Sequence, residues 1–525
     1  MKPSRGGDDQ HEVDGPDAAA ASVADEAGTD PIGRSGPGFG RALSWSYVLT
    51  SGRAVVTLVV SLVLARLLGP EAFGIIAMAT VFVLFVEMFV RQGLVAAIVQ
   101  RPRLTALHLD TAFWMTVGTV SVLVPVTMAA SGWWADVNDM PPLQPVIIAL
   151  SSLLALKGLG VVQEAQIRRQ MDFRLLAVRT NVAVVVGGAV GIGSALAGAG
   201  LWALVIQQVV TAAIELVLIW HMTSWRPRLR FRKDCAVELL SFSARSSLAA
   251  LGNFINLRSD ALLIGLFFGP VVVGLYRMAV RFIDLSLEIA AGALQSVFLP
   301  ELARYADDRE AFNDRTVEVM RTGSLLAVPL LGVLAAASDP LMALVGEQWL
   351  PASDTLKVLC ILAAVQAMSM FLGPILQAAG RPGVLAWLTW ISAGLSALSF
   401  VGSGLLLAGL SIERQVVLLA AIRTAVFVPT LFVVVFPVFR RILGLGGGRL
   451  VAAVWPASVA ALVGFGAVHL MQELFGSAWM EPPLIGIALA GALSGLVTIG
   501  LLALIEPAAR RLPGTLIRKV RGRAA

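Results

Sequence analysis

Four charged side chains recur at helical spacing within one apolar stretch of the sequence. Arg277, Arg281, Asp284 and Glu288 are separated by four, three and four residues, which places them on one face of a helix. A guanidinium donates paired hydrogen bonds to phosphate, so this face is suited to bind a ligand that carries phosphate groups. The same spacing also allows a self-satisfied ladder, in which Arg281 bonds Asp284 or Glu288.

Three more ionisable residues lie in neighbouring apolar stretches, where a charge is costly and usually faces a cavity or a partner. Arg258 and Asp260 are two residues apart, so they do not face each other and each needs a partner elsewhere. We expect Arg258 and Arg53 to line the same cavity as Arg277 and Arg281. Asp260, like Asp284 and Glu288, fits either an ion-coupling site or a structural ion pair.

Other ionisable residues in apolar stretches give weaker signals. Glu215 is a lone carboxylate and a candidate for coupling. Arg423 is a similar candidate, with the alternative that its side chain reaches towards the membrane surface. His469 fits a packed core histidine. Cys235 and Cys360 have no spacing that suggests a metal site or a disulfide framework.

The elements that carry these residues are those of an all-α integral membrane protein. Hydrophobic residues make up 57% of the chain and charged residues 14%, and the mean hydropathy is +0.81. A soluble domain is roughly 45–50% apolar and about 25% charged. Apolar runs of about 18 residues or more recur along the chain, and each is long enough to span a membrane. They predict fourteen helices, at 43–68, 73–92, 109–130, 143–162, 175–197, 200–220, 242–267, 271–297, 322–338, 356–379, 384–409, 415–438, 450–475 and 483–505.

Lysine and arginine gather in every second loop, which fixes the expected orientation. The longest such run extends from Arg226 to Lys233, whereas the intervening loops are short and mostly acidic or neutral. Residues 1–38 contain eight acidic and three basic residues without an apolar core, which indicates a disordered tail rather than a signal peptide. We therefore expect a multi-pass protein of the cytoplasmic membrane with both termini in the cytoplasm.

An internal repeat becomes visible when the chain is compared with itself. Gly69-Pro70 aligns with Gly269-Pro270, and Met78-Ala79 with Met278-Ala279. Six predicted helices separate the two copies, so the halves keep the same orientation and form parallel repeats. The predicted architecture is two six-helix lobes around a central cavity, plus two C-terminal helices. The segments are an acidic tail (1–38), an N-lobe (39–224), a basic linker (225–240), a C-lobe (241–440), helices 13 and 14 (448–508) and a basic tail (509–525).

Enzyme classes with recognisable motifs find no support in the sequence. We find no nucleophile elbow, no HExxH, no Walker A and no GxGxxG between a strand and a helix. We therefore expect neither an enzyme nor a cofactor or metal. The net charge of +6 follows the loops, so we read it as a topology signal rather than a nucleic-acid site.

Two segments carry a resemblance to a known family. LARLLGPEAFGIIAMATVFVLF from Leu64, followed by RQGLVAAIVQR from Arg91, is similar to polysaccharide transporters of the multidrug/oligosaccharidyl-lipid/polysaccharide (MOP) exporter superfamily. RSDALLIGLFFGPVVVGLYRMAVRF from Arg258 and FLPELARYADD from Phe298 show the same likeness. The resemblance covers roughly residues 40–440. Within that superfamily, the sequence is most similar to the Wzx-like flippases and exporters.

The resemblance implies a flippase or exporter that moves a lipid-diphosphate-linked oligosaccharide or exopolysaccharide across the cytoplasmic membrane. Its expected partners are that lipid-linked saccharide, membrane lipid and the polysaccharide polymerase or export machinery. One alternative is an ion-coupled multidrug exporter of the same fold, and another is a non-transporting scaffold of a polysaccharide assembly complex. The sequence leaves open the cargo's identity, the coupling ion, the oligomeric state, and the roles of the acidic tail and of helices 13 and 14.

Overall fold

The computed structural model describes residues 37–101, 104–170, 172–305, 308–369, 372–476 and 478–506, and its regular elements there are all helical. The chain divides into two compact units, 1–48 and 49–525, and the contacts below lie within the second. The expected terminal tails fall outside the described residues, except that Pro37 and Gly38 begin a helix.

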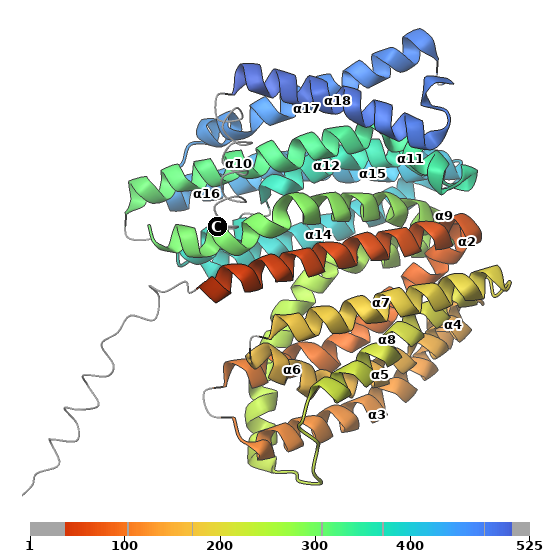
Figure 1. Ribbon diagram of the computed structural model, residues 1–525, viewed down its shortest axis with the longest axis vertical. Coiled ribbons are helices and arrows are strands. Elements are labelled where there is room, and N and C mark those ends of the chain that lie inside the picture. The colour runs from red at the N-terminus through yellow and green to blue at the C-terminus, as the bar shows by residue number, and fades with distance from the viewer. Residues whose placement is uncertain are drawn as a thin grey trace, which may run out of the picture. The chain divides into compact units, whose positions relative to one another are not determined.

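The elements, labelled in Figure 1, are α2 (Pro37–Gln100), α3 (Ala106–Val137), α4 (Leu143–Leu150), α5 (Ser152–Gly158), α6 (Val161–Arg169), α7 (Phe173–Leu196), α8 (Trp202–Met222), α9 (Lys233–Ala303), α10 (Arg309–Ala336), α11 (Ser338–Val345), η1 (Glu347–Trp349), α12 (Ala352–Ser369), α13 (Leu372–Ala378), α14 (Pro382–Leu407), α15 (Ile412–Thr430), η2 (Leu431–Val435), α16 (Phe436–Leu443), α17 (Gly447–Phe475), η3 (Ala478–Met480) and α18 (Pro483–Ile505).

Helices that can cross a membrane account for most of this chain. Among the described residues, eleven helices are long and apolar enough to do so. A twelfth crossing results if Leu143–Gly158 and Val161–Arg169, which meet at 43°, form one bent span. The protein is therefore a multi-pass membrane protein, as its composition predicts.

The two longest helices, α2 and α9, are each broken at a glycine. Gly69 has φ 76° and ψ 174°, and Gly269 has φ 78° and ψ −178°, so both leave the helical region in the same way. A side chain strongly disfavours this positive φ, and glycine permits it. A proline follows each glycine and suits the first position of the next helical segment, because it has no N–H to leave unpaired.

The two broken turns pack directly against each other. A Cβ atom added to Gly74 would lie 1.8 Å from the carbonyl oxygen of Pro270. Reciprocally, a Cβ atom on Gly274 would lie 2.0 Å from the carbonyl oxygen of Pro70. The helical segments after the two turns can approach this closely because both positions are glycine.

The turn at Gly69 is also bound to the second half of the chain. Pro70 has no N–H to donate to the carbonyl of Arg66 four residues earlier, and that oxygen accepts a hydrogen bond from Gln348 Nε2 at 3.3 Å. Trp349 is fully buried, and its Nε1 donates to the carbonyl of Ala65 at 3.0 Å. The broken helix thus exposes carbonyl groups that anchor it to η1 and the end of α11.

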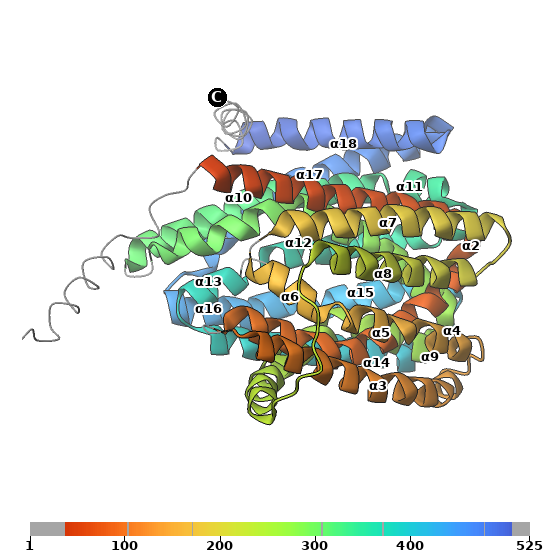
Figure 2. The ribbon, with the colours of Figure 1, turned by 60° about the horizontal axis from the view of Figure 1, so that its bottom comes forward.

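Helices of each half contact mainly one another. In the first half α7 packs along α8, while α3 contacts α4, α5 and α6. In the second half α10, α12, α13 and α14 pack against α9, and α12 also contacts α15. The last two helices, α17 and α18, lie side by side in both views and pack on α10 (Figures 1 and 2).

The connection between the halves is shorter than the sequence suggests. The helix α8 ends at Met222 and α9 begins at Lys233, so the last part of the predicted linker 225–240 is already helical. The first acidic residue of α9, Asp234, lies in its first turn, where the helix dipole favours a negative charge.

Candidate functional site

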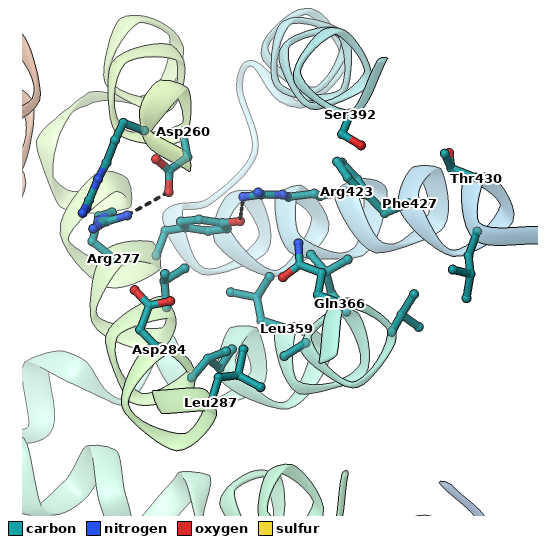
Figure 3. A pocket seen from close by; sticks show the side chains of 18 of the residues that line it. Asp260, Arg277, Asp284, Leu287, Leu359, Gln366, Ser392, Arg423, Phe427 and Thr430 are labelled. Atoms are coloured by element: carbon teal, nitrogen blue, oxygen red, sulfur yellow. Dashed lines mark hydrogen bonds and ion pairs between the residues drawn. The ribbon is translucent and has the colours of Figure 1, made fainter. Parts of the chain in front are cut away.

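A cavity of about 580 Å³ lies among α9, α12, α14, α15 and η2, in the second half of the chain (Figure 3). Its wall combines charged and polar side chains with leucine, valine, isoleucine and phenylalanine. Such cavities between packed helices are typical of ligand sites. The polar residues of the wall are Arg258, Asp260, Tyr276, Arg277, Asp284, Gln366, Ser392, Arg423 and Thr430.

The break at Gly269 turns α9 back on itself and brings two charged residues of this wall together. Asp260 precedes the break and Arg277 follows it, and Arg277 Nη1 lies 3.0 Å from Asp260 Oδ2 (Figure 3). Asp260 is only 5% exposed, and its other carboxylate oxygen has no hydrogen-bond partner within the described chain. Asp260 therefore presents one satisfied oxygen and one open acceptor.

Arg423 of α15 belongs to the same wall. Its Nη1 donates to the hydroxyl of Tyr276 at 2.6 Å, and its guanidinium lies 5.0 Å from the ring centre of Phe400 and 5.8 Å from that of Phe427. Aromatic faces attract a cation, most strongly where water is excluded. The interpretation of Arg423 as a side chain reaching to the membrane surface is therefore wrong, because the structure turns it inward.

Two further charges in the wall are open. Arg258 and Asp284 both line the cavity, and neither forms a hydrogen bond or an ion pair with another described residue. Each retains its full capacity to bind a ligand: Arg258 as a donor fork and Asp284 as an acceptor. Among the described side chains, the cavity wall thus has one cation and one carboxylate without a partner beside two paired arginines.

The four charges that the sequence places on one face are divided by the structure. Arg277 and Asp284 line the cavity, whereas Arg281 does not, and its Nη2 donates instead to the carbonyl of Thr57 in α2 at 3.3 Å. Glu288 is exposed and lies outside the cavity wall. The spacing keeps all four on one side of the helix, but contact with α2 takes Arg281 out of the cavity wall. Among the described residues no hydrogen bond or ion pair joins Arg281 to Asp284 or Glu288, so the expected ladder is wrong.

Arg53, the remaining arginine expected at the cavity, lies within α2, but its side chain is outside the described part of the chain. Tyr276, Gln366 and Ser392 line the cavity but were not among the site residues predicted from the sequence. Gln366 had a readable signal, since it is an amide within the apolar helix α12. Tyr276 and Ser392 had none, because their positions in the wall depend on how α9 and α14 pack.

A second charged cluster lies in the first half of the chain. Arg179 of α7 is buried, and its Nη2 lies 3.7 Å from a carboxylate oxygen of Glu164 and 3.7 Å from one of Glu215. The description of Glu215 as a lone carboxylate is therefore wrong. Nearby, Lys157 Nζ lies 2.7 Å from Glu87 Oε2. These pairs join α2, α5, α6, α7 and α8 by charges that satisfy one another.

His469 is exposed, whereas the sequence predicts a packed core histidine. Its side chain is 61% exposed, and its Nε2 lies 3.6 Å from Glu473 one turn later in α17. The two cysteines, Cys235 and Cys360, are free and buried. Among the described residues, no group of three or more histidine, cysteine or carboxylate side chains is arranged to hold a metal ion.

The cavity has the chemistry to hold a large polar ligand with a negative charge. Arg258, Arg277 and Arg423 outnumber the carboxylates of Asp260 and Asp284, so an anionic group restores charge balance. Guanidinium groups match phosphate and carboxylate oxygens in pairs. The two carboxylates, together with amide and hydroxyl groups in the wall, are suited to exchange hydrogen bonds with sugar hydroxyls.

Several known proteins are similar to this chain in sequence, and a solved structure shares its fold. The chain is 26% identical over 356 residues to the succinoglycan biosynthesis transport protein ExoT of Rhizobium meliloti, covering 67% of this chain and 72% of that protein. It is 23% identical over 340 residues to the lipopolysaccharide biosynthesis protein WzxC of Escherichia coli, covering 64% and 69%. The lipid II flippase MurJ, in an inward closed conformation, shares the fold with a TM-score of 0.66 at 13% identity, over 86% of this chain and 97% of that one. The model of the family described as "Polysaccharide biosynthesis protein" matches residues 63–354, more than half of this chain, and the protein therefore belongs to that family.

Proposed function

We propose that this protein moves a lipid-diphosphate-linked oligosaccharide or exopolysaccharide across the cytoplasmic membrane by alternating access. The observation that carries the proposal is the arginine-lined cavity within membrane-spanning helices, in a member of a polysaccharide biosynthesis family. The names of ExoT and WzxC associate those relatives with succinoglycan transport and lipopolysaccharide biosynthesis. A glycan flippase of Haloferax volcanii is a further relative, 26% identical over 213 residues.

The open groups of the cavity suit the two parts of such a cargo. Arg258 has no partner to give up among the described residues, so it can bind an anionic group without breaking an existing pair. Arg277 is held by Asp260, and we infer that an anion competes with this carboxylate for it. Gln366 and Ser392 on the opposite wall are available to sugar hydroxyls.

The architecture that supports transport consists of fourteen crossings in two lobes. The breaks at Gly69 and Gly269 divide α2 and α9 into two crossings each. Each break adds one crossing to the twelve counted as unbroken or bent spans, and we infer fourteen in total. Lobes at 39–224 and 241–440 then have the same orientation, with helices 13 and 14 following them, and both termini in the cytoplasm.

In this arrangement the paired Gly-Pro turns face outward. The contact of Gly74 with Pro270, and of Gly274 with Pro70, joins the lobes at that end. We infer that the lobes part there to release cargo outside and close there to receive it from the cytoplasm. We also propose that an ion gradient is coupled to transport, with Asp260 and Asp284 as the candidate coupling residues. Polysaccharide polymerase or export machinery would receive the product.

The test is deletion of the gene followed by complementation with cavity variants. Loss of surface polysaccharide together with accumulation of lipid-diphosphate-linked sugar is expected. Wild-type protein restores export, whereas Arg258→Gln does so poorly. The matched control is Arg440→Gln, which removes an exposed arginine of α16 that does not line the cavity.

The same assay separates the alternatives. Normal polysaccharide and normal precursor levels in the deletion strain contradict the proposal, and increased sensitivity to cationic drugs would then favour a multidrug exporter. Full export by several stably expressed cavity variants indicates a scaffold. Accumulated precursor that wild type relieves and Arg258→Gln does not supports both the cargo and the cavity.

A further inference from the structure

The connection from α8 to α9 is a non-helical strap, Thr223–Arg232, with an unusual pattern of exposed side chains. Arg228, Arg230 and Arg232 alternate with Leu229 and Phe231, and all five are exposed. Leu229 is 88% exposed and Phe231 56% exposed. The N–H of Arg230 donates to the carbonyl of Arg228 at 2.7 Å, so the strap bends at Leu229. Arginines and large apolar side chains therefore share one short exposed surface.

This strap is fastened to the first turns of α3 rather than hanging loose. The backbone N–H of Arg228 donates to Asp110 Oδ1 at 3.1 Å, and that of Arg232 donates to Thr111 Oγ1 at 3.3 Å. Trp114 Nε1 donates to the carbonyl of Arg228 at 2.8 Å. Since Asp110 and Thr111 are almost fully buried, these bonds hold the strap against α3, and Leu229 and Phe231 remain exposed.

A cluster of aromatic side chains marks the depth of the strap in the membrane. Phe113 lies 5.5 Å, ring centre to ring centre, from Trp114 and 6.1 Å from both Trp220 and Trp225. Tryptophan gathers at the level of lipid headgroups, because its ring is apolar and its N–H needs a partner. Trp114 and Trp225 are in or directly beneath the strap, which therefore lies at the same level.

The length of α3 agrees with this depth. Its 32 residues extend about 48 Å at a rise of about 1.5 Å each, well beyond the roughly 30 Å of the hydrocarbon core. The polar residues His108, Asp110 and Thr111 occupy its first turns. That end of α3 therefore lies among headgroups, and the strap crosses it there.

The start of α9 continues the same surface. Cys235 and Leu239 are buried one turn apart, while Val237 is 67% exposed and Leu240 is 59% exposed. Apolar side chains on the outer face of a first helical turn are stable where lipid, rather than water, covers them. Lys233 adds a further positive charge at this point.

We propose that the strap is a docking surface for anionic phospholipid. Leu229 and Phe231 insert between acyl chains, and Arg228, Arg230 and Arg232 bind headgroup phosphates of the same leaflet. Each arginine near an anionic surface contributes roughly 1 kcal/mol of attraction, which salt screens. The inference uses only the membrane location of the chain and is independent of the cargo.

The experiment places a polarity-sensitive fluorophore on Leu229→Cys in full-length protein whose buried cysteines are replaced, as C235A and C360A. The protein is reconstituted in nanodiscs of phosphatidylcholine alone, and in nanodiscs that also contain phosphatidylglycerol. We expect blue-shifted emission and a several-fold lower rate of quenching by an aqueous quencher in the anionic discs. Added salt should reverse the difference.

Two variants make the result decisive. The triple variant R228Q/R230Q/R232Q should abolish the dependence on phosphatidylglycerol, whereas R381Q/R440Q/R441Q removes the same charge from other exposed positions and should leave it intact. A fluorophore that is quenched equally in both discs, or whose lipid dependence survives the strap substitutions, overturns the proposal. Protection that appears without anionic lipid but with an added acidic protein would also overturn it.

Discussion

At the scale of single residues, the buried pair of Asp260 and Arg277 makes opposite predictions for single and double substitutions. Asp260→Asn leaves Arg277 as an uncompensated charge in a dry environment, and breaking such a pair typically costs about 3–5 kcal/mol. We expect a clear fall in the apparent Tm of purified protein in detergent. The double variant D260N/R277M removes both charges and should recover most of the loss. A double variant as unstable as the single one would show that packing, not charge pairing, is responsible.

Arg258 has the reverse profile, because it has no partner among the described residues. Its replacement by glutamine should leave the Tm nearly unchanged, yet reduce export, since it removes an open donor from the cavity. Arg258→Lys keeps the charge but loses the paired geometry, so we expect intermediate export. The measurement is surface polysaccharide in the complemented strain, normalised to membrane expression. Equal export by all three proteins would remove Arg258 from the proposed site.

How well the sequence predicts the site depends on whether spacing or packing determines a residue's position. The sequence predicts that Asp260 needs a partner, because a carboxylate lies in an apolar stretch and Arg258, two residues away, does not face it. Its pairing with Arg277 required knowing that α9 turns back at Gly269. Arg281 shows the limit of spacing alone, because its contact with α2 depends on which helix packs beside that face of α9.

At the scale of elements, the facing glycines predict a steric test of the contact between the two broken helices. Gly74→Ala and Gly274→Ala each place a methyl group within about 2 Å of a proline carbonyl, so backbone must shift. Overpacking of this kind typically costs about 1–3 kcal/mol. We expect a lower Tm and reduced export from both variants.

The control for that test is Gly500→Ala in α18, where an added Cβ atom meets no atom within 4 Å. It carries the same change in helix propensity, which favours alanine, without the clash. A Tm for Gly74→Ala that matches the control would show that the two turns do not pack as described. Near-equal losses from the two facing glycines would instead reflect their reciprocal contact.

Most of the helices could be predicted from the lengths of the apolar runs in the sequence. The segments at 483–505 and 175–197 correspond to α18 and α7 within a few residues. The structure divides the span expected at 143–162 among α4, α5 and the start of α6, with a bend of 43° after Gly158. Hydropathy reports only how apolar a segment is, and the bend arises from packing that leaves its hydropathy unchanged.

At the scale of the whole molecule, the proposed alternating access requires the contact between α2 and η1 to open in every cycle. Arg66 and Gln348 make hydrogen bonds across it: Gln348 Nε2 to the carbonyl of Arg66 at 3.3 Å, and Arg66 Nη1 to the carbonyl of Leu344 at 3.1 Å. Both side chains are exposed, so cysteines at these positions are accessible to reagents. Transport requires two states, and a covalent bridge removes one of them.

We therefore expect that Arg66→Cys combined with Gln348→Cys, in the background lacking Cys235 and Cys360, loses export when a short bifunctional thiol reagent bridges the pair. A reducible reagent should allow export to recover after reduction, which distinguishes locking from damage. Each single-cysteine protein treated with the same reagent is the control and should export normally, because no bridge can form. Undiminished export by a fully bridged protein would mean that this contact stays closed during transport, and the pathway would then have to open elsewhere. Loss of export confined to the bridged pair would establish the contact as a moving gate, whatever saccharide passes through it.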